Sequence, residues 1–221
     1  MRITIVGSGC VGRALGGAWM QAGHRVAFAV RDPESANAWL AQALGARLIE
    51  LEAAGHGTDV VVLAVPWEHV ADVLTAVGPL DGVTVIDATN PVVPPYARLE
   101  VSGDDSGAET IQRRIPSARV VKAMNTCGWE TMEQPVYAEG RAVMPVAADD
   151  AAAKERVLGL VRDLGFDAVD AGDLAAARLL EPLAMLRIRL AMAQGLGRGC
   201  AFRLMRRFRL VRLTASPFQS P

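Results

Sequence analysis

The chain has 221 residues, of which 51% are hydrophobic and 21% are charged, and its formal net charge is −1. This composition is that of a globular protein with a sizeable core, and its near neutrality excludes a general attraction to nucleic acid or to an anionic membrane surface. No stretch reaches the roughly 18 uninterrupted apolar residues of a membrane span. We therefore expect a soluble, cytoplasmic protein with no nucleic-acid or membrane partner.

The first half of the chain alternates short apolar runs with helical stretches. The runs are nearly continuous, which is typical of strands with both faces covered in a parallel sheet. Small and apolar residues from 11 to 22 recur at helical spacing, and Gly23 ends this helix. The alternation predicts an α/β fold, a Rossmann-type doubly wound parallel sheet. Its expected strands are Ile3–Val6, Val26–Val30, Val60–Val65 and Val83–Asp87.

The glycine loop after the first strand is the most specific local motif. It reads Gly7-Ser8-Gly9-Cys10-Val11-Gly12 and opens a helix within a unit of about 30 residues. The first glycine permits a tight turn, the second lets the backbone approach a pyrophosphate, and the third lets helix and strand pack closely. Free N–H groups and the positive dipole end of the helix attract the diphosphate. All six residues are therefore predicted to bind a dinucleotide cofactor.

Arg31 and Asp32 determine which dinucleotide is expected. An acidic residue about 20 positions after the loop holds the 2′-hydroxyl of NAD, whereas an arginine there accepts the 2′-phosphate of NADP. Arg31 directly follows the strand Val26–Val30, while Asp32 suits the N-cap of a helix that Pro33 would begin. Because a guanidinium–phosphate contact is strong and charge-assisted, the sequence predicts NADP(H) as the cofactor.

Further cofactor contacts are expected where the later strands end, because ligands of open α/β sheets bind there. His69 is either a general acid or, more often at a helix start, a hydrogen-bonding or packing residue. Lys122 lies inside a strand, which favours a structural or rim position over a catalytic one. The expected contacts are Ala64, Val65, Pro66, His69, Asn90, Pro91, Ala123 and Asn125, with Asn90 and Pro91 at the nicotinamide.

The second half of the chain has weaker signals. Strands are expected at Val120–Ala123, Ala142–Ala148 and Asp167–Ala171, with a helix from Asp150 to Leu164 and a last helix from about Leu174 into the region of Met192. The cysteines and histidines lack the spacing of metal ligands, so no bound metal is expected. The C-terminal arginines suit either a solvated, disordered end or an anion-binding face. They are Arg198, Arg203, Arg206, Arg207, Arg209 and Arg212.

Together these motifs resemble the coenzyme F420-dependent NADP oxidoreductases. The resemblance rests on Gly7–Gly12, Arg31, Val65-Pro66-Trp67-Glu68-His69, and the runs Asp170–Leu174 and Ala177–Leu183. It implies an NADP-binding Rossmann domain over residues 1–125. It also implies a small, mainly helical C-terminal domain over residues 126–221, which closes the cleft that holds the deazaflavin.

The resemblance further implies hydride transfer between NADP(H) and coenzyme F420 or a similar planar acceptor. Such a reaction requires mainly proximity and orientation from the protein, so no catalytic side chain is assigned. Leu183 and Met185 either wall the deazaflavin pocket or pack in the core. Other functions stay open: an NADPH-dependent reductase of an imine, quinone or flavin, or a non-catalytic dinucleotide-sensing protein. A homodimer also stays open.

Overall fold

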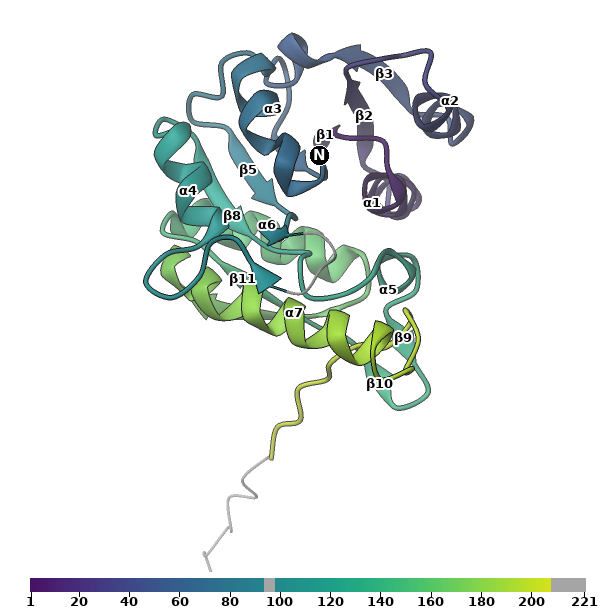
Figure 1. Ribbon diagram of the computed structural model, residues 1–221. Coiled ribbons are helices and arrows are strands. Elements are labelled where there is room, and N and C mark those ends of the chain that lie inside the picture. The colour runs from purple at the N-terminus through teal and green to yellow at the C-terminus, as the bar shows by residue number, and fades with distance from the viewer. Residues whose placement is uncertain (94–97, 208–221) are drawn as a thin grey trace, which may run out of the picture.

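The computed structural model describes residues 1–93 and 98–207, and its centre is one eight-stranded sheet (Figure 1). The strand order is β12-β11-β8-β5-β4-β1-β2-β3, and all pairings are parallel except that of β11 with β8. The chain winds outward from β1 in one direction through β2 and β3, and in the other through β4 and β5. This confirms the predicted doubly wound Rossmann sheet.

The elements of the sheet largely match the sequence prediction, with one edge strand that the sequence did not indicate, β3. The strands are β1 Arg2–Val6, β2 Arg25–Val30, β3 Arg47–Glu50, β4 Val60–Leu63, β5 Thr84–Asp87, β8 Arg119–Lys122, β11 Val143–Ala147 and β12 Asp167–Gly172. Two short hairpins lie outside the sheet, β6 Val92–Val93 with β7 Arg98–Leu99 and β9 Val136–Tyr137 with β10 Gly140–Arg141.

Seven α-helices are formed by the described residues. They are α1 Cys10–Gln21, α2 Ala36–Ala43, α3 Val70–Ala76, α4 Gly107–Arg114, α5 Trp129–Glu133, α6 Ala151–Asp163 and α7 Ala177–Met192. Short 3₁₀ turns precede α3 at Trp67–His69 and α7 at Leu174–Ala176, and a third follows β3 at Leu51–Ala53. None of these helices is long and apolar enough to cross a membrane.

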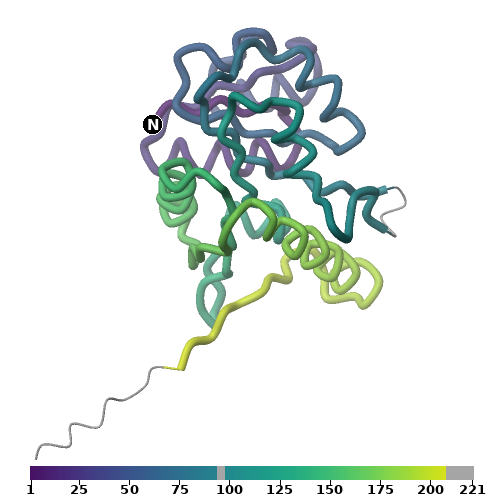
Figure 2. The backbone as a smooth tube through the Cα atoms, turned by 90° about the vertical axis from the view of Figure 1, so that its left-hand side faces the viewer, coloured from purple at the N-terminus to yellow at the C-terminus, as the bar shows by residue number. Residues whose placement is uncertain are grey.

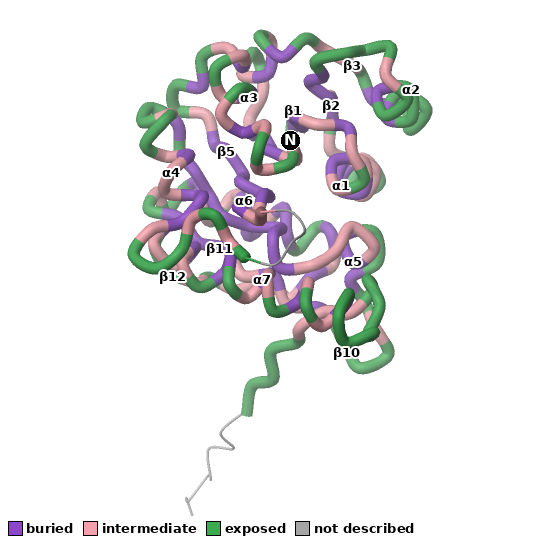
Figure 3. Tube along the Cα trace, in the orientation of Figure 1, coloured by how far each residue is buried: buried purple, intermediate pink, exposed green. Residues whose placement is uncertain are grey.

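The hydrophobic core forms two clusters, one on each face of the sheet. The central strands between them are buried (Figure 3). On one face Ile5 and Phe28 pack with α1 and α6. The Trp19 ring on α1 is fully buried there and donates its N–H to the Leu160 carbonyl on α6 at 3.1 Å. On the other face Val61 packs with α3 and α4. Because both faces are covered, the central strands are apolar on both sides.

The start of α2 differs from the prediction. The helix begins at Ala36, and Ser35 is its N-cap, accepting a hydrogen bond from the Ala38 N–H at 3.3 Å. Asp32 instead stabilises the preceding turn, where its Oδ1 accepts from the Glu34 N–H at 2.9 Å. Asp32 and Ser35 are both suitable N-cap residues. Because Asp32 forms the turn before the helix, Ser35 becomes the N-cap of α2.

The sheet continues beyond the boundary expected after residue 125. Strands β11 and β12 extend it past β8, and α6 packs against them as the predicted helix from Asp150 to Leu164. The region after residue 125 also contains α5 and α7, and α7 holds Pro182 within it. The division into domains at residue 125 stays a prediction.

The C-terminal segment turns back after α7 and then extends away from the body of the molecule (Figure 2). The Val143 N–H donates to the Phe202 carbonyl at 2.9 Å, which fixes the start of this segment to β11. Arg203 donates to the Glu139 carbonyl, and Arg206 lies 3.7 Å from the Asp167 carboxylate. The predicted arginines at 209 and 212 lie outside the described residues.

Candidate functional site

The glycine loop joins β1 to α1 at the carboxyl edge of the sheet. Gly7 has a φ of 105°, a conformation that favours glycine, and a Cβ there would lie 2.5 Å from the Ala64 carbonyl oxygen. A Cβ on Gly12 would lie 2.1 Å from the Gly7 carbonyl oxygen. These two glycines are therefore required by the fold of the loop itself.

Gly9 differs from its two partners, because a Cβ there would meet no protein atom within 4 Å. Gly9 is also the N-cap of α1 and, having no side chain, makes no capping hydrogen bond to the first turn of this helix. The free N–H groups and the positive end of the helix dipole therefore face open space. This combination suits an anionic group that lies on the backbone.

Arg13 holds the glycine loop against α2. Its Nη1 donates to the Ser8 carbonyl at 2.6 Å and to Asn37 Oδ1 at 2.9 Å. The arginine thus sets the distance between the loop and the start of the next helix. Sequence reasoning missed both Arg13 and Asn37, since neither belongs to a motif and the contact joins separate helices.

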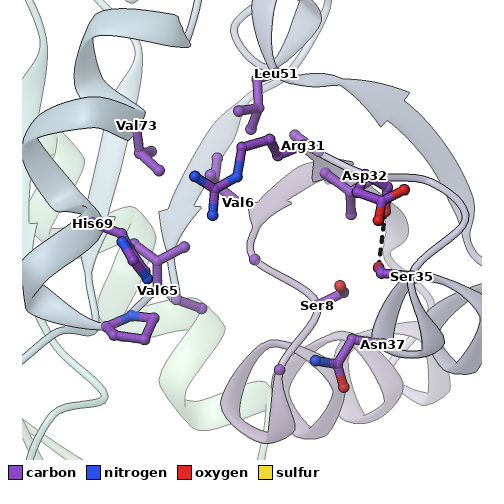
Figure 4. A pocket seen from close by; sticks show the side chains of 16 residues that line it. Val6, Ser8, Arg31, Asp32, Ser35, Asn37, Leu51, Val65, His69 and Val73 are labelled. Atoms are coloured by element: carbon purple, nitrogen blue, oxygen red, sulfur yellow. Dashed lines mark hydrogen bonds between the residues drawn. The ribbon is translucent and has the colours of Figure 1, made fainter.

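A cavity of about 360 Å³ opens between the glycine loop, the end of β2 and the end of β4 (Figure 4). It brings together eight of the predicted residues, namely Gly7, Ser8, Gly9, Arg31, Ala64, Val65, Pro66 and His69. The lining also includes residues that the sequence did not indicate, among them Ser35, Asn37, Leu51 and Val73. The predicted Cys10, Val11, Gly12, Asn90, Pro91, Ala123, Asn125, Leu183 and Met185 do not line this cavity.

Arg31 and Asp32 point in different directions from the end of β2. Figure 4 shows the Arg31 guanidinium turned into the cavity, towards the side that carries His69 and Val73, while Asp32 lies on the opposite side next to Ser35. The Ser35 hydroxyl donates to the Asp32 carbonyl at 2.8 Å, which keeps this turn in place. The cavity therefore offers a cation at the position where the sequence predicted one.

Three side chains could in principle donate a proton to a substrate, namely His69, Lys122 and Tyr137, and of these His69 lines the cavity. Lys122 is fully buried between the Asp87 and Glu181 carboxylates and cannot reach a ligand. Burial lowers the pKa of Lys122, but the attraction of both carboxylates outweighs this and leaves the pKa raised. The Tyr137 hydroxyl is engaged elsewhere, with the Gly199 carbonyl at 2.6 Å.

The ends of β5 and β8 form a second polar cluster. The Asn90 amide donates to the Asn125 carbonyl at 2.9 Å, and the Asn125 amide donates back to Asn90 Oδ1 at 3.0 Å. Asn125 Oδ1 is buried and accepts no hydrogen bond from the described residues. Met124, which precedes it, has a φ of 63°, so the backbone here is in the left-handed region that non-glycine residues rarely adopt.

The three cysteines differ in their environments. Cys10 is exposed at the start of α1, whereas Cys127 and Cys200 are partly covered. Burial raises the pKa of the Cys127 thiol to about 12, so this thiol stays protonated and unreactive at ordinary pH.

The residues that the structure describes contain no group of three or more His, Cys, Asp or Glu side chains arranged to hold a metal ion.

The fold and the cavity together define a class of protein, the Rossmann-type dinucleotide-binding proteins. Comparison with known proteins narrows this class. Residues 2–91 match the family described as NADP oxidoreductase, coenzyme F420-dependent. A crystal structure from Arthrobacter sp. FB24, provisionally named an F420-dependent NADP reductase, is 33% identical, with a TM-score of 0.84, and the match covers 92% of this chain and 99% of that one.

Two further relatives match most of this chain. A protein of unassigned function from Sinorhizobium meliloti is 30% identical, with a TM-score of 0.72, over 80% of this chain and 87% of its own. The metalloreductase STEAP3 of Rattus norvegicus is 29% identical over 188 residues, which is 84% of this chain. The present chain spans 37% of the length of STEAP3.

The chain belongs to the coenzyme F420-dependent NADP oxidoreductase family. The resemblance predicted from the sequence is thereby confirmed, and the family and fold indicate an NADP(H)-dependent oxidoreductase.

Proposed function

We propose that the chain binds NADPH along the carboxyl edge of its sheet and transfers a hydride from it to coenzyme F420 or a similar planar acceptor. The observation that carries this proposal is the shape of the cavity. The uncapped start of α1 at Gly9 and the guanidinium of Arg31 face the same open space of about 360 Å³. An N–H-rich helix start and a guanidinium that face one cavity suit the diphosphate and the 2′-phosphate of NADPH.

In this proposal the diphosphate lies on the backbone of Gly7–Gly12. The empty space beside Gly9 provides room for it, and Gly12 acts indirectly by keeping α1 close to the loop. Arg31 binds the 2′-phosphate, and Asn37, which Arg13 holds at the cavity, lies within the same lining. Asp32 is already hydrogen-bonded within its own turn, which favours NADPH over NADH.

The nicotinamide end is assigned to the ends of β4, β5 and β8. The cofactor would run from the cavity past Ala64, Val65 and Pro66 towards the paired Asn90 and Asn125. Asn125 Oδ1 accepts no hydrogen bond from the described residues, so it suits a donor such as the carboxamide N–H of nicotinamide. Pro91 and Ala123 are both buried and would pack beneath the nicotinamide rather than bond to it.

We place the hydride acceptor on the side of the nicotinamide that the residues after 125 form. Leu183 and Met185 on α7 are partly exposed and would supply an apolar wall. NADPH supplies the hydride, and the protein orients the two rings and excludes water. Family membership supports F420 as the acceptor, and so does the scarcity of acid–base groups among the described cavity residues, since a ring acceptor needs no dedicated proton donor.

One observation favours a second candidate, a reductase of an imine or another small acceptor. His69 lines the cavity and could donate a proton to a substrate nitrogen. The two candidates differ in the acceptor but share the cofactor.

The test is NADPH oxidation by the full chain against a panel of F420, FMN, a quinone and a simple imine. The proposal predicts the highest kcat/KM with F420, and activity with NADPH well above that with NADH. Turnover of the imine alone would establish the second candidate. NADPH binding without turnover of any acceptor would contradict both and favour a dinucleotide-sensing protein.

A further inference from the structure

Lys122 lies in a buried network of charges at the carboxyl ends of β5 and β8, the edge proposed above for the nicotinamide. Its Nζ is 2.8 Å from Asp87 Oδ2, 2.9 Å from Glu181 Oε1 and 2.7 Å from the Thr89 carbonyl oxygen. The exposed fractions of the three charged side chains are 0%, 0% and 1%. A buried ion pair rarely stabilises a fold more than well-packed apolar residues would. We therefore looked for a role of this network other than stability.

The network joins three elements that are distant in the sequence. Asp87 ends β5 and Lys122 ends β8, so both lie at the carboxyl edge of the sheet. Glu181 comes from α7, and its two oxygens also accept from the Gly107 N–H at 3.0 Å and the Ala108 N–H at 3.2 Å at the start of α4. Lys122 thus fastens two helices to the edge of the sheet where the cofactor would lie.

The same network sets the shape of the two loops that leave β5 and β8. Asp87 Oδ1 accepts from the Thr89 N–H at 2.9 Å and from its hydroxyl at 2.7 Å, which fixes the turn before Asn90. Asn90 pairs with Asn125, whose amide also donates to the Leu180 carbonyl at 3.1 Å. Leu180 immediately precedes Glu181, so one turn of α7 is tied to both loops.

We propose that Lys122 is a positioning residue that holds the Asn90–Asn125 pair and α7 in the arrangement that receives the nicotinamide end of NADPH. It does not touch the reacting atoms. This role rests on the proposed function, because it presumes that NADPH lies along this edge. It predicts that loss of Lys122 weakens the nicotinamide half of the site and leaves the adenosine half near Arg31 intact.

The experiment compares two ligands by calorimetric titration of the full chain. NADPH spans both halves of the site, whereas adenosine 2′,5′-bisphosphate reaches only the half that Arg31 and the glycine loop form. Lys122→Met should weaken NADPH about tenfold, the effect of losing roughly one well-placed hydrogen bond, and leave the bisphosphate unchanged.

Arg156→Met provides the matched control. Arg156 donates to the Thr84 hydroxyl at 2.6 Å, so it contacts the same strand as Asp87 but at the amino end. This variant should leave the affinity ratio of the two ligands unchanged, even where it lowers stability.

A second variant covers the case in which Lys122→Met fails to fold with two unpaired carboxylates buried. The triple variant Asp87→Asn, Lys122→Met, Glu181→Gln leaves no unpaired charge in the network and should fold. It should show the same selective loss of NADPH affinity.

The outcomes separate this role from the proposed function. Equal weakening of both ligands, or no weakening of NADPH, in a folded variant would show that Lys122 is only structural. Failure of the wild type to bind NADPH would overturn the proposed function and this role together. NADPH binding without reduction of any acceptor would overturn only the reaction, because the comparison of ligands remains valid.

Discussion

Gly12 lies so close to Gly7 that a Cβ on Gly12 would stand 2.1 Å from the Gly7 carbonyl oxygen. A Cβ on Gly9, in the same loop, would meet nothing within 4 Å. Gly12 is therefore required for the fold of the loop, whereas the open space at Gly9 is available to a bound ligand.

Gly9→Ala should fold normally and lose NADPH affinity by about ten- to a hundredfold, because the methyl group occupies space that the diphosphate needs and charge-assisted contacts are lost. Calorimetric titration with NADPH measures the loss. Gly17→Ala, on the same helix and with its nearest neighbour at 4.0 Å, should bind like the wild type. Undiminished affinity in Gly9→Ala would remove the glycine loop from the cofactor site.

Gly12→Ala should act on the fold instead. Overpacking at this contact should lower the free energy of unfolding by about 1–3 kcal/mol. Chemical denaturation of Gly9→Ala and Gly12→Ala side by side checks the contrast, and a Gly12→Ala protein as stable as the wild type would refute it.

Arg31→Ala should remove most of the preference for NADPH over NADH. A charge-assisted contact contributes roughly 1.5–3 kcal/mol, or about ten- to a hundredfold in affinity. The measurement is the ratio of kcat/KM for the two cofactors. Arg25→Ala is the matched control, because Arg25 begins the strand that Arg31 follows and lies at the opposite edge of the sheet. A wild type that prefers NADH would transfer the ribose contact to Asp32.

The thiols should react in an order set by their environments. Cys10 is exposed within the glycine loop, and burial raises the pKa of Cys127 to about 12. Since thiolate forms only as pH approaches the pKa, Cys127 should resist alkylation at mildly alkaline pH, whereas Cys10 should react. NADPH should protect Cys10 if the cofactor lies on this loop. Mass spectrometry locates the modified residue, with Cys10→Ala as control, and unprotected labelling of Cys10 at saturating NADPH would count against the site.

His69→Ala should keep kcat with a planar acceptor within about tenfold of the wild type, because hydride transfer to such a ring needs no side-chain acid. A true general acid contributes roughly 10²–10⁴-fold. Tyr137→Phe, which removes a hydroxyl that bonds outside the cavity, should behave alike. A loss of about a thousandfold in His69→Ala alone, with NADPH binding intact, would favour the imine or carbonyl reductase.

The parts that could be predicted from the sequence are those with local signals. Continuous apolar runs indicate β1, β2, β4 and β5, and the spacing of three glycines indicates the loop between β1 and α1. Arg31 directly follows β2 and lines the cavity, while its contact with a 2′-phosphate stays a prediction. These features depend on neighbouring residues and on the geometry of the chain.

The parts that could not be predicted depend on contacts between distant residues. Asp32 and Ser35 are both suitable caps, and only the turn between them decides that Ser35 begins α2. The ion pair of Lys122 with Glu181 joins a strand to the last helix. No local sequence pattern predicts this contact. The sequence therefore indicates a structural role for Lys122 but does not identify the residues that it pairs with.

The most direct test of the account is transfer of deuterium from C4-deuterated NADPH to F420 in a single turnover, followed by mass spectrometry of the acceptor. We expect the label on the acceptor ring at a rate that His69→Ala changes by less than about tenfold. Recovery of unlabelled F420 and undiminished NADPH, under conditions in which the protein oxidises NADPH with an imine, would contradict the account.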